Sequence, residues 1–462
     1  MRLTRGLAAL LFASALFILV VHANPPLRTD RFPRLALLIV HQRSLSEPVD
    51  DPVRGVHVAK FDDLVIDGRL YCNTNPGQAF LMVPGAVIAT RFGPSAERLA
   101  TLLMLVCGPL PLCALAIVAL VEMGLHLGLD LPRSLAAAAL FFLGTPFLTL
   151  SCMGVQNGPQ AALGVIAAWA IFVDRRWSVP LAGGVMGLAF LVDAAALLLA
   201  AILGVVIART RGRRSALIFF AVFVASSLVT LGPYDQACFG SWSALPNRVF
   251  FTARVEHGVL NDTIPRPGPA HLDLEGLDYA ALSWTTGLLW FTPFVVVALW
   301  STVRGAASSA SRNLGPLGAV PTLVALLYDA SAASWSHHEV LQNGFFGPRY
   351  QLWAAPFAAL ALVAGGSRQV AWGAGIWSIA VGLCAAMYPP VLSFWRFYAS
   401  WTLVLLRGPR APLVSALLGS RASLYEYRHG EASGWELSCL ALLLLGAWAR
   451  YARVLRTRAH HP

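Results

Sequence analysis

Apolar runs long enough to cross a membrane recur along this chain of 462 residues. Hydrophobic residues make up 57% of the sequence and charged residues only 12%, whereas a soluble domain carries about twice that charged fraction. The sequence therefore predicts an all-α, polytopic integral membrane protein with about 11–13 transmembrane helices. The runs cover residues 7–23, 99–124, 134–151, 158–174, 179–192, 194–208, 215–232, 284–303, 314–330, 350–366, 370–388 and 434–450.

Arginine residues gather at alternate connections between these runs. Together with the two chain ends, these connections carry 16 basic residues against two acids, Asp130 and Asp174. Basic residues near span ends stay in the cytoplasm, so we expect these connections and both termini to be cytoplasmic. The basic residues are Arg2, Arg5, Arg133, Arg175, Arg176, Arg209, Arg211, Arg213, Arg214, Arg304, Arg312, Arg368, Arg450, Arg453, Arg456 and Arg458.

The heavy use of Ala, Leu, Gly and Arg is typical of GC-rich bacterial genomes and favours the cytoplasmic (inner) membrane of a bacterial cell envelope. The net charge of +11 does not point to nucleic acid, because the arginines lie at span ends, where they meet anionic headgroups.

One segment is too short for the simple count of spans. Arg176 and Arg209 are both expected inside, yet only roughly 32 residues separate them, and two full spans need about 40. We therefore expect a short hairpin that turns at Asp193. The alternative is one long tilted helix, which would invert the topology of everything after it.

The same topology divides the chain into two parts. Residues 1–388 form the predicted transmembrane catalytic module, with a first outer loop at 24–98 that bears amphipathic helices and a second large outer loop at 233–283. Residues 389–462 comprise an outer amphipathic segment, a last transmembrane helix and a basic cytoplasmic tail. Ionisable residues are costly in a membrane protein, so the acids of the first loop indicate where its chemistry lies.

These acids are the catalytic candidates. Asp30 directly follows the first span, where a carboxylate at the membrane surface can act as general base on a hydroxyl. It also suits the N-cap of a helix that begins at Arg31. Asp62 and Asp63 follow Lys60, and adjacent acids can orient a sugar, hold a divalent cation or simply lie in a solvated loop.

A second group of candidates lies around the start of a late span. Arg349 and Tyr350 open it from the outer side, and an Arg can grip a phosphate through two parallel hydrogen bonds. Arg and Tyr also serve as interfacial anchors. His337 and His338 precede them, but adjacent histidines chelate poorly, and the seven cysteines form no CxxC pair. We therefore treat the histidines as substrate-binding candidates and predict no metal site.

Four short stretches follow one another along residues 1–366. They are Asp30; the series Asp63, Asp67-Gly68, Tyr71 and Pro76-Gly77; Gly144-Thr145-Pro146 with the hairpin at 183–193; and Phe346-Gly347-Pro348-Arg349-Tyr350 with Pro356. In this order they resemble the GT-C superfamily of polytopic glycosyltransferases, and most of all the bacterial members that use a polyprenyl-phosphate sugar donor.

The resemblance implies transfer of a hexosyl or pentosyl group at the extracytoplasmic face to a lipid, glycan or protein acceptor. It makes Asp30 the general base, with Asp62 and Asp63 as the other catalytic candidates. It makes Arg349 the residue that binds the donor phosphate. Lys60, Arg69 and Tyr71 of the first loop are weaker substrate-binding candidates.

The chain also departs from the family pattern. Many members carry a second acid or a His after the third span, where this chain has Met153-Gly154-Val155-Gln156-Asn157-Gly158. That difference argues against metal-bridged catalysis. The lysines of the family's first-loop motif are missing as well, which leaves the donor and the acceptor open.

Two other functions remain open. A transporter or a lipid or polysaccharide flippase would carry charged residues at mid-membrane in paired, inverted halves. The acids that we weigh for that role are Asp193, between two of the runs, and Glu122, and no internal symmetry is visible. An O-antigen-type polymerase or ligase would place its main outer loop late in the chain, as residues 389–433 do.

Overall fold

The computed structural model describes most of the helical body and part of the first outer loop. Predicted site residues Asp30, Lys60, Asp62, His337, His338, Arg349 and Tyr350 lie outside the described residues, as does segment 389–462, and for Asp63 only the backbone is described. The described residues are 3–23, 31–48, 50–51, 56–57, 63–66, 69–72, 74–92, 97–173, 175–242, 281–282, 288–303, 319–327, 352–365 and 368–387.

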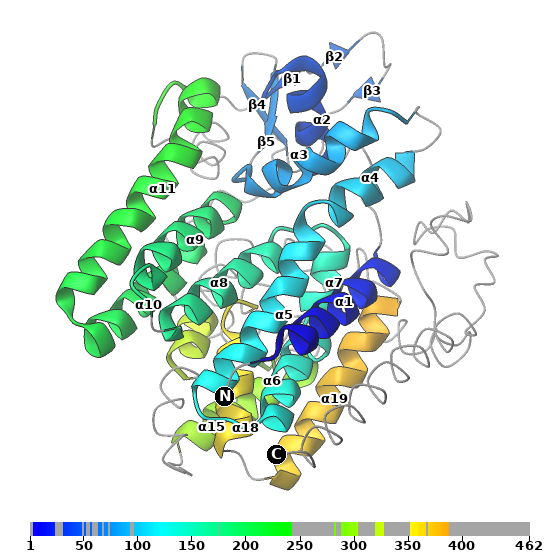
Figure 1. Cartoon of the computed structure of the whole chain (residues 1–462). Coiled ribbons are helices and arrows are strands. Elements are labelled where there is room, and N and C mark those ends of the chain that lie inside the picture. Colours follow the sequence, from blue (N-terminus) through cyan, green and yellow to red (C-terminus); the bar gives the residue numbers. More distant parts are fainter. Residues whose placement is uncertain are drawn as a thin grey trace, which may run out of the picture.

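A central helix, α5 (Pro109–His126), organises the bundle (Figure 1). Most of its side chains are buried, because it contacts α1 (Arg5–Val21), α6 (Leu131–Leu143) and α8 (Asn157–Phe172). Its sequence is apolar on all sides, which is typical of a helix surrounded by others. The predicted helical fold class is confirmed for the described residues.

Two groups of helices flank this centre. On one side, α9 (Ser178–Val192), α10 (Ala196–Arg211) and α11 (Arg213–Phe239) pack together and reach α8. On the other side lie four helices that contact one another and α6. They are α14 (Leu288–Phe291), α15 (Pro293–Val303), α18 (Ala355–Gly365) and α19 (Arg368–Met387).

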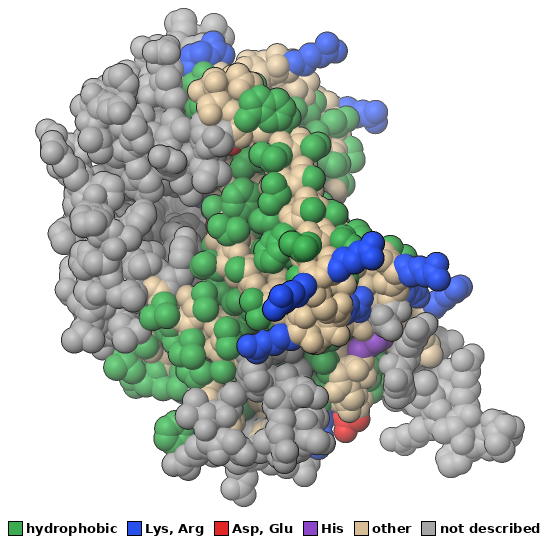
Figure 2. Space-filling view, turned by 90° about the vertical axis from the view of Figure 1, so that its left-hand side faces the viewer, with side chains coloured by type: hydrophobic (Ala, Val, Ile, Leu, Met, Phe, Trp, Pro, Cys, Tyr) green, Lys and Arg blue, Asp and Glu red, His purple; other side chains and the backbone are tan. Residues whose placement is uncertain are grey.

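Large apolar side chains cover the outside of the bundle. Leu217, Val229 and Ile376 are 69%, 72% and 62% exposed, and Figure 2 shows hydrophobic side chains across the middle of one face, with Lys and Arg above and below. Two helical stretches, Arg98–His126 and Arg213–Phe239, are long and apolar enough to cross a membrane. Such a surface suits lipid better than water, as a polytopic helical membrane protein requires.

Several predicted spans are interrupted helices. The run at 99–124 is divided into α4 (Glu97–Val106) and α5, and the run at 134–151 into α6 and α7 (Phe147–Cys152). The second break has a local cause, because the Thr145 hydroxyl donates to the Phe141 carbonyl at 2.6 Å and accepts from the Phe147 N–H at 3.1 Å. The hydroxyl thus replaces helical partners that Pro146 disrupts.

The hairpin expected at Asp193 is present. Helix α9 ends at Val192, Asp193 adopts extended backbone angles, and α10 begins at Ala196 and packs back against α9. The alternative of one long tilted helix is wrong. At 15 and 16 residues, the two arms are about 22–24 Å long, shorter than a full span.

The first outer loop contains a helix and short strands. Helix α2 (Arg31–Gln42) is amphipathic, as expected. An antiparallel sheet of order β1-β5-β4 joins β1 (Glu47–Pro48), β5 (Arg69–Cys72) and β4 (Asp63–Ile66), and β2 (Asp50–Asp51) pairs with β3 (Val56–His57). These strands were not expected from the sequence. Asp67 and Gly68 separate β4 from β5, and an Asp-Gly pair favours two-residue hairpins.

The helix that follows this sheet, α3 (Gly77–Ala89), approaches its neighbours at backbone distance. A Cβ added at Gly85 would lie 2.3 Å from both Leu103 O and Met104 Cα of α4. A Cβ at Gly108 would lie 2.0 Å from Leu81 O of α3. Glycine is needed at both positions because backbone atoms cannot move aside as a side chain can.

We predict that Gly85→Ala will lower the unfolding free energy by about 1–3 kcal/mol, the cost of overpacking a tight contact. Gly373→Ala in α19 is the matched control, since nothing lies within 4 Å of a Cβ there. Equilibrium unfolding in mixed detergent micelles measures both. Equal stability of the two variants would contradict the close approach of α3 to α4.

Candidate functional site

A polar network joins three distant segments at one end of the bundle. From the start of α2, Arg31 Nη2 donates to Gln156 Oε1 at 3.2 Å. Gln156 Nε2 then donates to Asp193 Oδ2 at 3.0 Å. A neutral amide has both a donor and an acceptor group, so one glutamine can bind a cation and an anion at once.

The carboxylate of this network is buried and capped. Asp193 is 7% exposed, and its Oδ1 accepts the N–H of Ala195 at 2.9 Å. A buried carboxylate is costly unless it is paired, and these bonds supply partners for an acid between two apolar helices. Asp193 therefore fastens the tip of the α9–α10 hairpin to the segment that precedes α8.

The turn before α3 binds the same region. Asn75 is 2% exposed, and its Nδ2 donates to Phe190 O at 2.6 Å. That carbonyl belongs to the last turn of α9, where helical donors have run out. Gln78 Nε2 donates to Gly154 O at 3.0 Å. At Gly77 an added Cβ would lie 2.6 Å from the Leu191 carbonyl, so the Pro76-Gly77 motif is the point where α3 touches α9.

An ion pair ties the first-loop sheet to α2, and a second set of polar contacts joins β5 to the segment before β1. Arg34 Nε lies 3.0 Å from Glu47 Oε1, and both side chains are less than a tenth exposed. Arg69 Nε donates to Ser46 Oγ at 2.7 Å, and Arg69 Nη2 donates to Ser46 O at 3.1 Å. Arg69 therefore anchors β5 to the segment before β1, and the phosphate contact predicted for it stays a prediction.

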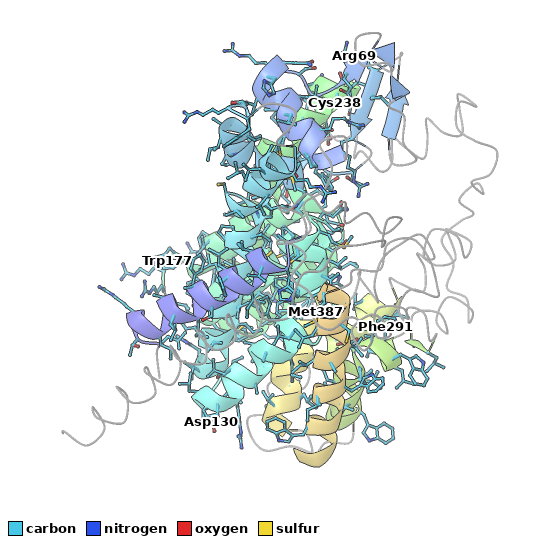
Figure 3. All side chains as sticks on the ribbon, turned by 90° about the vertical axis from the view of Figure 1, so that its right-hand side faces the viewer. Arg69, Asp130, Trp177, Cys238, Phe291 and Met387 are labelled. Atoms are coloured by element: carbon cyan, nitrogen blue, oxygen red, sulfur yellow. The ribbon has the colours of Figure 1, made fainter. Side chains whose placement is uncertain are left out.

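Tyr71 belongs to an aromatic cluster rather than to the polar network. Its ring lies 5.7 Å from that of Phe239, and Tyr234 lies 6.1 Å from both Phe239 and Phe80. The cluster packs β5 against the end of α11. Figure 3 shows Arg69 and Cys238 at this end of the molecule and Asp130 toward the other.

The described candidates from the sequence thus gather in one hairpin. Arg69 and Tyr71 lie on β5, and Asp63 opens β4, where it pairs with Cys72. Within the described residues, no group of three or more His, Cys, Asp or Glu could hold a metal ion.

Three residues at the first-loop end of the bundle were not predicted as site residues from the sequence. Arg31 was named only as the start of a helix that Asp30 could cap, and Gln156 only as part of a departure from the family pattern. Asp235 was not a candidate. It is 1% exposed, and among the described residues neither of its carboxylate oxygens has a hydrogen-bond partner. A polar residue at the outer end of an apolar span is the signal that could have found it.

Comparison with known protein families gives no match, and neither does comparison with curated proteins. Among solved structures, the chain is similar to ArnT from Cupriavidus metallidurans, crystallised with undecaprenyl phosphate. The identity is 16% and the TM-score 0.47, over 96% of this chain and 75% of that one. It is also similar to the Archaeoglobus fulgidus oligosaccharyltransferase in the apo form, at 13% identity and TM-score 0.44, over 91% of this chain and 55% of that one.

We predict that Gln156→Leu will destabilise the protein by about 1–3 kcal/mol, because it removes a side-chain donor from a buried carboxylate. Gln236→Leu is the control, since Gln236 is exposed on α11. Equilibrium unfolding in mixed micelles measures the difference. If both leucine variants match the wild type, the Arg31–Gln156–Asp193 network contributes nothing to stability.

Substitution of Asp235, in contrast to Gln156, should stabilise the protein. Burial of a charge without a partner is unfavourable, so Asp235→Asn should raise the unfolding free energy by about 1 kcal/mol or more. A stability gained in this way commonly costs activity at a functional site. Thermal unfolding in detergent tests the first point, and a lower midpoint for the variant would show that Asp235 has a stabilising partner after all.

Proposed function

We propose that this chain is a membrane glycosyltransferase that moves a sugar from a polyprenyl-phosphate donor to a lipid, glycan or protein acceptor at the extracytoplasmic face. The observation that carries the proposal is the network of Arg31, Gln156 and Asp193. The network holds Arg31, the first residue of α2, against the ends of buried helices, and Arg31 directly follows Asp30 in the sequence. Reacting groups need such fixed positions.

The proposed reaction follows from the chemistry of the candidates. The Asp30 carboxylate takes the proton of the acceptor hydroxyl as the oxygen attacks the anomeric carbon of the sugar. The bond from that carbon to the phosphate oxygen breaks, and polyprenyl phosphate leaves with the bonding electrons. The leaving phosphate gains negative charge. In this proposal Arg349, at the outer start of a late predicted span, binds that charge.

The other candidates have supporting roles in this proposal. Asp62 and Asp63 are alternative bases or contacts for sugar hydroxyls. Lys60, Tyr350, His337 and His338 are donors for the phosphate or the sugar. Arg69 and Tyr71 hold the hairpin that carries these acids, since their described contacts are with Ser46 and Phe239.

We predict that Asp30→Asn will reduce transfer by about 10²–10⁴-fold, the usual contribution of a general base. Arg349→Ala should reduce it by about a hundredfold or more, because one donor to the developing charge is lost. The assay follows a labelled sugar from a polyprenyl-phosphate donor in reconstituted vesicles.

Asp130→Asn is the control for the change from carboxylate to amide. Asp130 caps the start of α6, and its exposed side chain lies far from the first-loop sheet (Figure 3). Full transfer by both Asp30→Asn and Arg349→Ala would reject the proposed site. Loss in the Asp130→Asn variant as well would mean that the assay reports folding rather than catalysis.

A further inference from the structure

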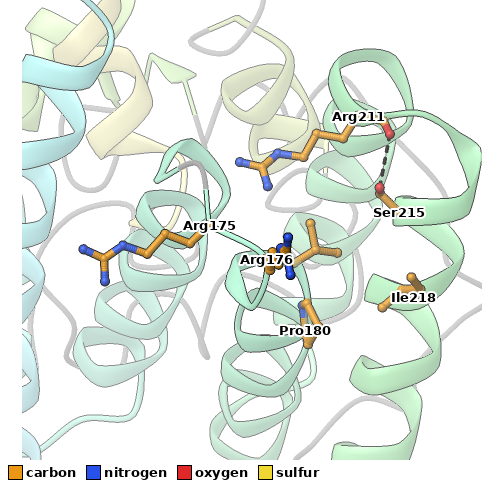
Figure 4. A pocket seen from close by; sticks show the side chains of 7 residues that line it. Arg175, Arg176, Pro180, Arg211, Ser215 and Ile218 are labelled. Atoms are coloured by element: carbon orange, nitrogen blue, oxygen red, sulfur yellow. Dashed lines mark hydrogen bonds between the residues drawn. The ribbon is translucent and has the colours of Figure 1, made fainter.

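A basic hollow lies at the ends of α9 and α11 that are remote from the first loop (Figure 4). Its volume is about 420 Å³, and it is lined by Arg175, Arg176, Arg211 and Ser215 together with the apolar side chains Val179, Pro180 and Ile218. No acidic residue lines it among the described residues, and Asp174, the nearest acid in the sequence, lies outside them.

The hollow is separated from the first-loop sheet by the length of α11. That helix has 27 residues, which is about 40 Å at 1.5 Å per residue. Phe239 at its last turn packs on Tyr71, whereas Ser215 in its first turn lines the hollow. A separation of this size exceeds the roughly 30 Å hydrocarbon core. The hollow therefore lies at the membrane surface that the arginine pattern assigns to the cytoplasm.

One of the arginines is held rigidly. Arg211 Nη1 donates to Ser178 Oγ at 2.7 Å, and Arg211 Nη2 donates to the Ile171 carbonyl at the end of α8. The Ser215 hydroxyl donates to the Arg211 carbonyl at 3.1 Å (Figure 4). Because this guanidinium is already fixed, a ligand that binds it loses no further conformational entropy in ordering the side chain.

The other two arginines lie nearer the surface. Arg176 is exposed at the hollow, and Arg175 extends away from it in Figure 4, with its guanidinium 5.5 Å from the Trp177 ring. Both α9 and α11 also begin here, so the partial positive charges of two helix N-termini add to those of the arginines. The field at this hollow selects an anion.

The apolar part of the lining indicates which anion. Val179, Pro180 and Ile218 would contribute nothing to a small hydrated phosphate. They continue onto exposed apolar side chains of the same helices, such as Leu181 and Leu217, which are 37% and 69% exposed. A phosphate attached to acyl chains can use both parts, with the headgroup on the arginines and the chains along α9 and α11.

We propose that this hollow binds the phosphate headgroup of an anionic phospholipid from the cytoplasmic leaflet. The site is distinct from the catalytic site proposed above and does not depend on it. Arg176 supplies an exposed donor and Arg211 a fixed charge, and Ser215 holds the Arg211 backbone at the rim of the hollow.

Native mass spectrometry of the full-length protein in detergent tests this site with phosphatidylglycerol and phosphatidylcholine. The wild type should retain phosphatidylglycerol in preference to phosphatidylcholine, and Arg176→Gln should weaken retention of phosphatidylglycerol about tenfold. Arg209→Gln removes one exposed charge near the hollow without touching its lining, so it should change retention less than about twofold, as expected of an exposed surface charge.

Three results would overturn the proposal. The first is equal retention of the two lipids by the wild type. The second is equal loss in Arg176→Gln and Arg209→Gln, which would reveal diffuse surface charge instead of a site. The third is displacement of phosphatidylglycerol by millimolar inorganic phosphate, which would make this a site for a soluble anion. The thermal midpoint of each variant in phosphatidylcholine shows whether it is folded. If Arg176→Gln does not fold, Arg211→Lys, which keeps the charge, is the second variant.

Discussion

The end of the bundle that carries the first loop depends on one glutamine amide that joins an arginine to an aspartate. Gln156 accepts from Arg31 and donates to Asp193, so a basic loop and an acidic hairpin tip meet through a neutral group. An acid at this position would repel Asp193, whereas the amide accepts from one partner and donates to the other.

The same region receives the turn before α3. This turn packs against the last turn of α9 and the segment before α8. Asn75 bonds the Phe190 carbonyl, and Gly77 permits backbone contact with Leu191. Asn75, Gln156 and Asp193 thus find buried hydrogen-bond partners in one another or in the backbone, and the same bonds position the first loop.

Apolar run length and the arginine pattern were sufficient to predict a helical membrane bundle and the turn at Asp193, because hydrophobicity and charge act on each segment separately. The breaks at Gly108 and Thr145 and the small sheet of the first loop were not predicted. The break at Gly108 and the sheet depend on contacts between segments, such as the approach of Gly108 to Leu81. The break at Thr145 depends on a side-chain hydroxyl that replaces a helical donor. For the same reason Arg69 and Tyr71 were identified as site residues by motif, whereas their structural contacts with Ser46 and Phe239 could not be foreseen.

In the proposed function, the loop fastened by Arg31 forms one catalytic site with the start of a late span. The direct test is a structure with a polyprenyl-phosphate analogue bound. We expect the phosphate within hydrogen-bond distance of Arg349, and the carboxylate of Asp30 close enough to reach a hydroxyl beside the sugar's anomeric carbon. A phosphate bound elsewhere, with Asp30 and Arg349 farther apart than one sugar phosphate can reach, would contradict it.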